Sequence, residues 1–200
     1  MARFRQTKLQ LREWLHQDDW RQRCAALDAL PPETVINPLL ACLPLGEPVT
    51  SRAAELLGRH VSRLMNTPGG EETAKTFMRR LMWHMNEESG NIGWGIPEAF
   101  GAILAAHRGL AETYGRVLIS YVLDTGHNDN FCDHAPLRRS CYRAVRKLIE
   151  AWPDLPEVAS LGGLAYRALR LGMDNDPDAT CRQLAAEAFD ALKQAQSHSA

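Results

Sequence analysis

The sequence lacks an uninterrupted apolar run long enough to cross a lipid bilayer. One of its longest, residues 117–123, is broken by Ser120, whereas a membrane-spanning helix needs about 20 apolar residues. The N-terminal residues 1–8 are basic, but no apolar stretch follows them before Glu13 and His16, as a secretory signal would require. We therefore expect no membrane span and a cytoplasmic location.

An excess of charge of either sign is also absent. Lys and Arg total 23 against 24 Asp and Glu, a formal net charge of −1, whereas domains that mainly neutralise phosphates usually carry a basic excess. Local basic stretches do occur, at Arg3, Arg5, Lys8 and Arg12 and at Arg138, Arg139, Arg143, Arg146 and Lys147. Solvated helix faces are the favoured interpretation of both stretches, and nucleic acid is a disfavoured partner.

No Cys-x-x-Cys pair is present, and the number of cysteines is odd. The five are Cys24, Cys42, Cys132, Cys141 and Cys181. In a chain expected in the cytosol, this pattern indicates reduced thiols that pack as small hydrophobic side chains. A disulfide framework is not expected.

Helical periodicity recurs along the chain, and no segment shows the sustained alternation of a half-buried strand. One apolar stripe comprises Leu110, Tyr114, Val117, Leu118, Tyr121 and Val122. Pro and Gly clusters separate such stripes. We predict one all-α domain over residues 1–200, with an N-terminal helix near 4–16 and five helical hairpins near 18–43, 48–87, 94–123, 136–171 and, incompletely, 177–196.

The first helices of these hairpins share a pattern of small residues beside larger aliphatic ones. The similar stretches within these helices begin at Arg23, Arg52, Pro97, Arg139 and Arg182. The pattern resembles the Arg-x-x-Ala-x-x-Leu signature of HEAT and armadillo repeats, which recur about every 40–47 residues. The resemblance implies an α-α superhelix, a HEAT-like solenoid suited to holding a partner; an unrelated helical bundle is the alternative.

Two connecting segments, residues 83–98 and 127–139, contain more Trp and titratable residues than a helix connection needs. In a solenoid both would lie on one edge, in layers about 8–10 Å apart, and residues 173–178 would extend that edge. We therefore predict one composite binding edge. Its candidate residues are Trp83, Asn86, Glu87, Glu88, Asn91, Trp94, Glu98, Phe131, Asp133, Arg138 and Arg139.

The same two segments carry a second resemblance. Trp-His-x-Asn-Glu-Glu-Ser-Gly-x-x-Gly-Trp-Gly-x-Pro-Glu, together with Cys-Asp-His-x-x-Leu-Arg-Arg-Ser, is similar to a group of HEAT-repeat proteins from sulfate-reducing bacteria. This resemblance covers the middle third of the chain. It implies the fold and supplies no activity.

Three interpretations of these segments remain open. The first is a non-enzymatic module that binds a protein or peptide without a cofactor, since Trp, Arg and Asn are typical of recognition surfaces. The second is an enzyme or sensor that holds a small ligand or a divalent metal such as zinc, through His84, Glu87, Glu88, Cys132, Asp133 and His134. The third is a structural network in which Asn86, Asn91 and Asp133 cap helix ends and Glu98 lies at the positive end of a helix dipole.

Catalytic residues are not predicted. Cys132 and His134 resemble a nucleophile and a base, but residues two apart rarely face each other on a helix. The sequence contains no triad or oxyanion-hole signature.

Overall fold

Helices make up all the regular secondary structure of the described residues. The computed structural model describes residues 2–86, 92–127, 130–160 and 162–197, and within these ranges it contains no β-strand. The predicted all-α class is therefore confirmed for this part of the chain. The chain forms two compact units, Met1–Ala99 and Phe100–Ala200, which are described in turn.

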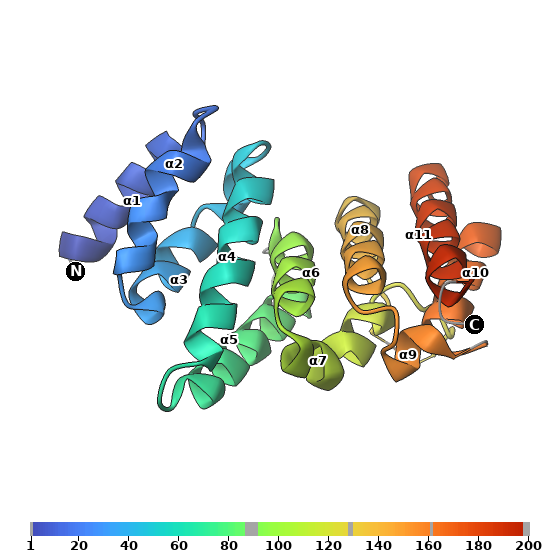
Figure 1. Ribbon diagram of the computed structural model, residues 1–200. Helices are drawn as coiled ribbons and strands as arrows, with labels where there is room; N and C mark the ends of the chain where they lie inside the picture. The colour runs from blue at the N-terminus through green and yellow to red at the C-terminus, as the bar shows by residue number, and fades with distance from the viewer. Residues whose placement is uncertain (1, 87–91, 128–129, 161, 198–200) are drawn as a thin grey trace. The chain divides into compact units, whose positions relative to one another are not determined.

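The first unit is built around helix α4 (Val49–Met65). Helix α3 (Pro32–Leu40), the short 3₁₀ helix η2 (Leu43–Leu45) and helix α5 (Gly70–Met85) all pack against α4, and helix α1 (Ala2–Trp14) packs against α3 (Figure 1). The core between them is aliphatic and includes Leu11, Leu15, Val35, Leu39, Leu57, Val61, Met78 and Leu81. Burial of the apolar face of each helix is what stabilises short helices in a protein.

The predicted helix that contains the repeat-like stretch beginning at Arg23 is interrupted. Helix α2 (Trp20–Cys24) passes directly into the 3₁₀ helix η1 (Ala25–Ala29). Leu30, which follows, is extended (ψ 151°) because it precedes a proline. Within η1, Asp28 accepts hydrogen bonds from Arg59 and Arg63 of α4, which ties the irregular segment to the core helix.

The second unit contains helices α7 (Arg108–Ser120), α8 (Ala135–Ala151), α9 (Pro156–Ala159), α10 (Leu164–Asn175) and α11 (Ala179–Ser197), together with the part of α6 (Ile96–Ala106) that follows Ala99. Helix α8 packs against α7 and α11, and α10 packs against α11 and α7 (Figure 1). Helices α6 and α8 approach closely at Gly101, where an added Cβ would lie 2.7 Å from that of Ala144. Small residues thus permit the contact, as the sequence pattern suggested.

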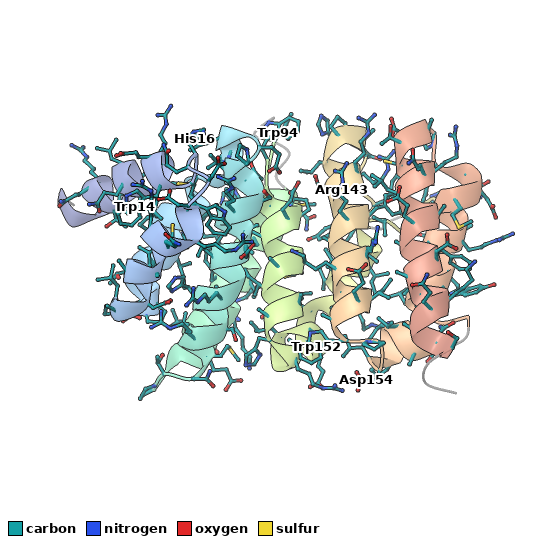
Figure 2. All side chains as sticks on the ribbon, turned by 45° about the horizontal axis from the view of Figure 1, so that its top comes forward. Trp14, His16, Trp94, Arg143, Trp152 and Asp154 are labelled. Atoms are coloured by element: carbon teal, nitrogen blue, oxygen red, sulfur yellow. The ribbon has the colours of Figure 1, made fainter. Side chains whose placement is uncertain are left out.

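Trp152 and Asp154 make stabilising contacts at one end of the second unit (Figure 2). The Trp152 indole Nε1 donates to the carbonyl oxygen of Leu104 at 2.8 Å, and Arg108 pairs with the Asp154 carboxylate at 2.8 Å. These contacts join the α6–α7 turn to the segment after α8.

No described helix combines the length and apolar character that crossing a membrane would require.

Candidate functional site

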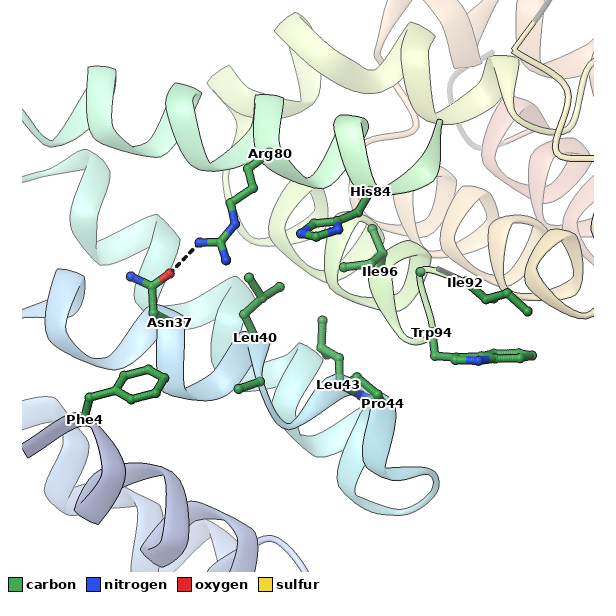
Figure 3. Close-up of a pocket in the computed structure, with 12 residues that line it drawn as sticks. Phe4, Asn37, Leu40, Leu43, Pro44, Arg80, His84, Ile92, Trp94 and Ile96 are labelled. Atoms are coloured by element: carbon green, nitrogen blue, oxygen red, sulfur yellow. Dashed lines mark hydrogen bonds between the residues drawn. The ribbon is translucent and has the colours of Figure 1, made fainter. Parts of the chain in front are cut away.

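An open groove in the first unit is lined by residues from α1, α3, η2, α5 and the connection before α6. Its volume is about 460 Å³, and its walls comprise Phe4, Asn37, Leu40, Ala41, Leu43, Pro44, Arg80, His84, Ile92, Gly93, Trp94 and Ile96. In Figure 3, Arg80 and His84 project from α5 toward Leu40 and Leu43, while Phe4 and Trp94 lie at opposite ends. We call this cavity the α1–α5 groove.

Gly95 fixes the connection that carries Trp94. Its φ is +77°, and a Cβ there would lie 2.7 Å from the Leu43 Cβ and 2.9 Å from the Leu43 carbonyl oxygen. The same carbonyl accepts a hydrogen bond of 2.7 Å from the Thr50 hydroxyl. Only glycine combines this backbone conformation with so close an approach, so the connection lies tightly against η2 and holds Trp94 at the rim.

Large apolar side chains at the rim of the groove remain exposed. Phe4 is 43% exposed, Ile92 38% and Trp94 45%, whereas Leu43 and Ile96 below them are buried. An apolar side chain exposed by itself is ordinary, but several around one cavity are typical of a binding surface. The apolar rim of the α1–α5 groove is therefore the strongest candidate for a site.

The charged side chain in the groove wall is a cation. Arg80 is exposed and donates through Nη1 to the Asn37 amide oxygen at 2.8 Å, and the described residues of the lining include no Asp or Glu. Burial raises the pKa of the nearby Cys42 thiol to about 11, and the positive charges of Lys8 and Arg12 on α1 act in the opposite direction. The groove thus combines an apolar surface with the positive charge of Arg80, and the Lys8 and Arg12 charges of α1 act on Cys42, which directly precedes the lining residue Leu43.

The first predicted segment contributes five described residues to this groove, and two of them, His84 and Trp94, are predicted site residues. Trp83 is exposed on α5, with its ring edge-on to that of His84 at 5.1 Å between centroids. Asn86 ends α5 through its backbone N–H, which donates to the Met82 and Trp83 carbonyls. Glu98 lies in the first turn of α6, as expected. The predicted residues Glu87, Glu88 and Asn91 lie outside the described residues.

Arg138, predicted on the binding edge, lies inside the second unit with 1% of its surface exposed. Its Nε and Nη2 each donate to the Asp176 carboxylate at 2.8 Å, and Nη1 donates to the carbonyls of Cys132 and Asp133. Tyr142 completes the cluster by donating to Asp176 at 3.1 Å. Arg138 therefore offers no surface to a partner, because its donors stabilise the protein from within.

Arg139 makes a second link between the same two segments. It pairs with the Asp178 carboxylate through two hydrogen bonds of 3.0 and 2.6 Å, and this interaction holds the pKa of Asp178 well below its usual range. The carboxylate also accepts from the Cys181 backbone N–H in the first turn of α11. Residues 131–139 and the loop after α10 therefore do lie together, as predicted, and a polar network holds them there.

The remaining residues of the second segment surround that network. Phe131 is half-buried, and its ring centroid lies 4.7 Å from the Arg138 guanidinium carbon. Asp133 and His134 are exposed at the start of α8. The Cys132 thiol is buried and hydrogen-bonds with Cys141, which lowers the pKa of Cys132. In the ranges that the structure describes, no group of three or more His, Cys, Asp and Glu side chains is arranged to hold a metal ion.

The residues of the groove that lie outside the predicted segments come from other helices. Phe4, Leu40 and Leu43 follow the apolar pattern of core positions, so nothing in their spacing marked them as part of a surface. For Arg80, the only indication of a role in the site was its position close to Trp83 in the sequence. The composite edge itself joins residues of both units and stays a prediction.

Comparisons with protein-family models, with curated proteins and with solved structures gave no match.

Proposed function

We propose that the protein is a non-enzymatic helical-repeat scaffold of the HEAT kind that binds a peptide segment of a protein partner, with the α1–α5 groove as its docking surface. The observation that carries this proposal is the set of exposed apolar side chains at the groove, Phe4, Ile92 and Trp94. Aromatic side chains held rigidly around an apolar cavity are typical of residues that dominate binding energy.

The repeat architecture is supported by the packing within the second unit. Helix α8 lies against α11, and α7 lies against α10, so helices that occupy equivalent places in successive pairs are neighbours. In a repeat scaffold each pair buries its apolar face against the next pair. Residues far apart in sequence are then held in fixed positions, which is what a docking surface requires.

Affinity measurements with a purified partner test the docking surface. A partner captured with the full chain would be purified and its dissociation constant measured for the wild type, Phe4→Ala and Trp94→Ala. Loss of an aromatic anchor is expected to weaken binding about tenfold or more. Both melting temperatures should stay close to that of the wild type, because exposed side chains change stability by about 0.5 kcal/mol or less.

Leu9→Ala is the matched control, since Leu9 is exposed on the same helix as Phe4 but does not line the groove. It should bind as the wild type does. Unchanged affinity for Phe4→Ala and Trp94→Ala would refute docking in the groove.

A further inference from the structure

Arg80 differs from the ion-paired arginines of the first unit in the partner that it has. The ion pairs of that unit include Arg21 with Glu55, Arg23 with Asp19, Arg59 and Arg63 with Asp28, and Arg79 with Glu72. Arg80 is bound instead to the neutral amide of Asn37. No carboxylate among the described residues lies within ion-pair distance of it, so in that part of the chain the exposed guanidinium of the groove wall has no negatively charged partner.

Helix α1, whose Phe4 lines the groove, carries further cations. Phe4, Lys8 and Arg12 follow one another at intervals of four residues, so they share one face of α1. Phe4 lines the groove, and Lys8 and Arg12 are exposed. As with Arg80, no ion pair forms at Lys8 or Arg12 within the described residues. Positive charge therefore lies in the groove wall at Arg80 and on the face of α1 that carries Phe4.

We infer that the α1–α5 groove selects an acidic peptide segment, in which bulky apolar side chains enter the cavity and carboxylates pair with Arg80 and Lys8. The inference rests on the proposed docking function and specifies the chemistry of its partner. Complementary charge of this kind orients a ligand and suppresses wrong partners. The neutral Asn37 amide holds the Arg80 guanidinium in position without cancelling its charge, which lowers the cost of ordering it on binding.

A peptide fits the groove better than a nucleic acid does. Five of the twelve described lining residues, Leu40, Leu43, Pro44, Ile92 and Ile96, have large aliphatic side chains, whereas single-stranded nucleic acid is usually bound by aromatic stacking along a continuous basic track. The net charge of −1 also gives little general attraction for phosphates. Aliphatic walls with a few cations favour Leu-, Phe- or Trp-containing segments that also carry Asp or Glu.

A displayed library of random peptides tests the inference with the full chain as bait. Selection would be carried out on the wild type, with removal of peptides that also bind the Phe4→Ala/Trp94→Ala double variant. Enriched peptides should combine Asp or Glu with bulky apolar residues. Synthetic peptides of these sequences, labelled with a fluorophore, should bind to Arg80→Gln about tenfold more weakly than to the wild type. Replacing the peptide carboxylates by amides should weaken binding to the wild type by the same factor.

Arg79→Gln is the matched control, because Arg79 neighbours Arg80 on α5 but pairs with Glu72 and does not line the groove. Arg79→Gln should therefore bind the peptides with the affinity of the wild type.

Enriched peptides that are neutral or basic, or unchanged affinity in Arg80→Gln, would overturn the acidic partner while leaving docking intact. An absence of peptides that distinguish the wild type from the double variant would instead refute the proposed function. A single-stranded oligonucleotide that displaces the peptides and depends on Arg80 would overturn a peptide partner.

Discussion

The guanidinium of Arg138 and the carboxylate of Asp176 form a two-point ion pair inside the second unit, with both contacts at 2.8 Å. Removing one member leaves a buried charge without its counterpart, so Arg138→Met should lower the free energy of unfolding by about 3–5 kcal/mol. The double variant Arg138→Met/Asp176→Leu should lose less than the sum of the two single changes. Urea unfolding followed by circular dichroism provides the comparison. A loss below about 1 kcal/mol in Arg138→Met would contradict the assigned structural role.

Because of the buried His60, we expect the protein to lose stability in mild acid. Its side chain is fully buried, and burial, followed by the nearby Arg63 charge, lowers its pKa from 6.5 to about 4. Between these two values the unfolded chain binds a proton that the native protein does not, so stability falls as pH falls from 6.5 to 4. The full effect is roughly 3 kcal/mol.

Unfolding free energies measured across that pH range check this prediction. His60→Gln should flatten the dependence, because the glutamine side chain does not titrate. The control is His127→Gln, which changes an exposed histidine of the second unit and should keep the slope of the wild type. An equally steep slope in His60→Gln would show that other groups cause the acid sensitivity.

The close approach of α6 and α8 makes Gly101 sensitive to a single methyl group. A Cβ at Gly101 would lie 2.7 Å from the Ala144 Cβ and 2.8 Å from its Cα, and overpacking of this kind costs about 1–3 kcal/mol. Gly101→Ala should therefore lower the melting temperature. Gly115→Ala in α7 is the control, because its Cβ would meet only Leu148 at 3.5 Å and would gain helix propensity. Equal melting temperatures for the two variants would refute the tight contact.

Thiol labelling should distinguish Cys132 from the other cysteines. Burial raises the pKa of Cys24 and Cys42 to about 11 and that of Cys181 to about 12, whereas the hydrogen bond with Cys141 lowers that of Cys132. Because the thiolate is the reactive form, iodoacetamide at mildly alkaline pH should label Cys132 first in the native protein. Mass spectrometry of digested samples identifies the site, and faster labelling at Cys24 or Cys181 would refute the assignment.

The helices could be predicted from sequence because their apolar stripes are local. Leu110, Tyr114 and Leu118, for example, are all buried along α7 as their spacing requires. The burial of Arg138 could not be predicted in this way. Arginine is usually exposed, and its partner Asp176 lies 38 residues further along the chain, so only the tertiary structure brings the two together.

The candidate site was predicted in part. Trp94 and His84 stood out because Trp and His are rare in helix connections, and both line the α1–α5 groove. Phe4 did not stand out, since its spacing from Leu11 and Leu15 is that of a core stripe. Whether such a residue is covered depends on how far the neighbouring helix extends, which local spacing does not encode.

Methyl-resolved NMR of the full chain with a selected acidic peptide tests the docking surface most directly. Titration should shift the methyl signals of Leu40, Leu43, Ile92 and Ile96, which line the groove. Signals from the second unit, such as that of the exposed Leu171, should stay in place. Shifts that cluster around Leu171 and leave the four groove residues unchanged would contradict the account.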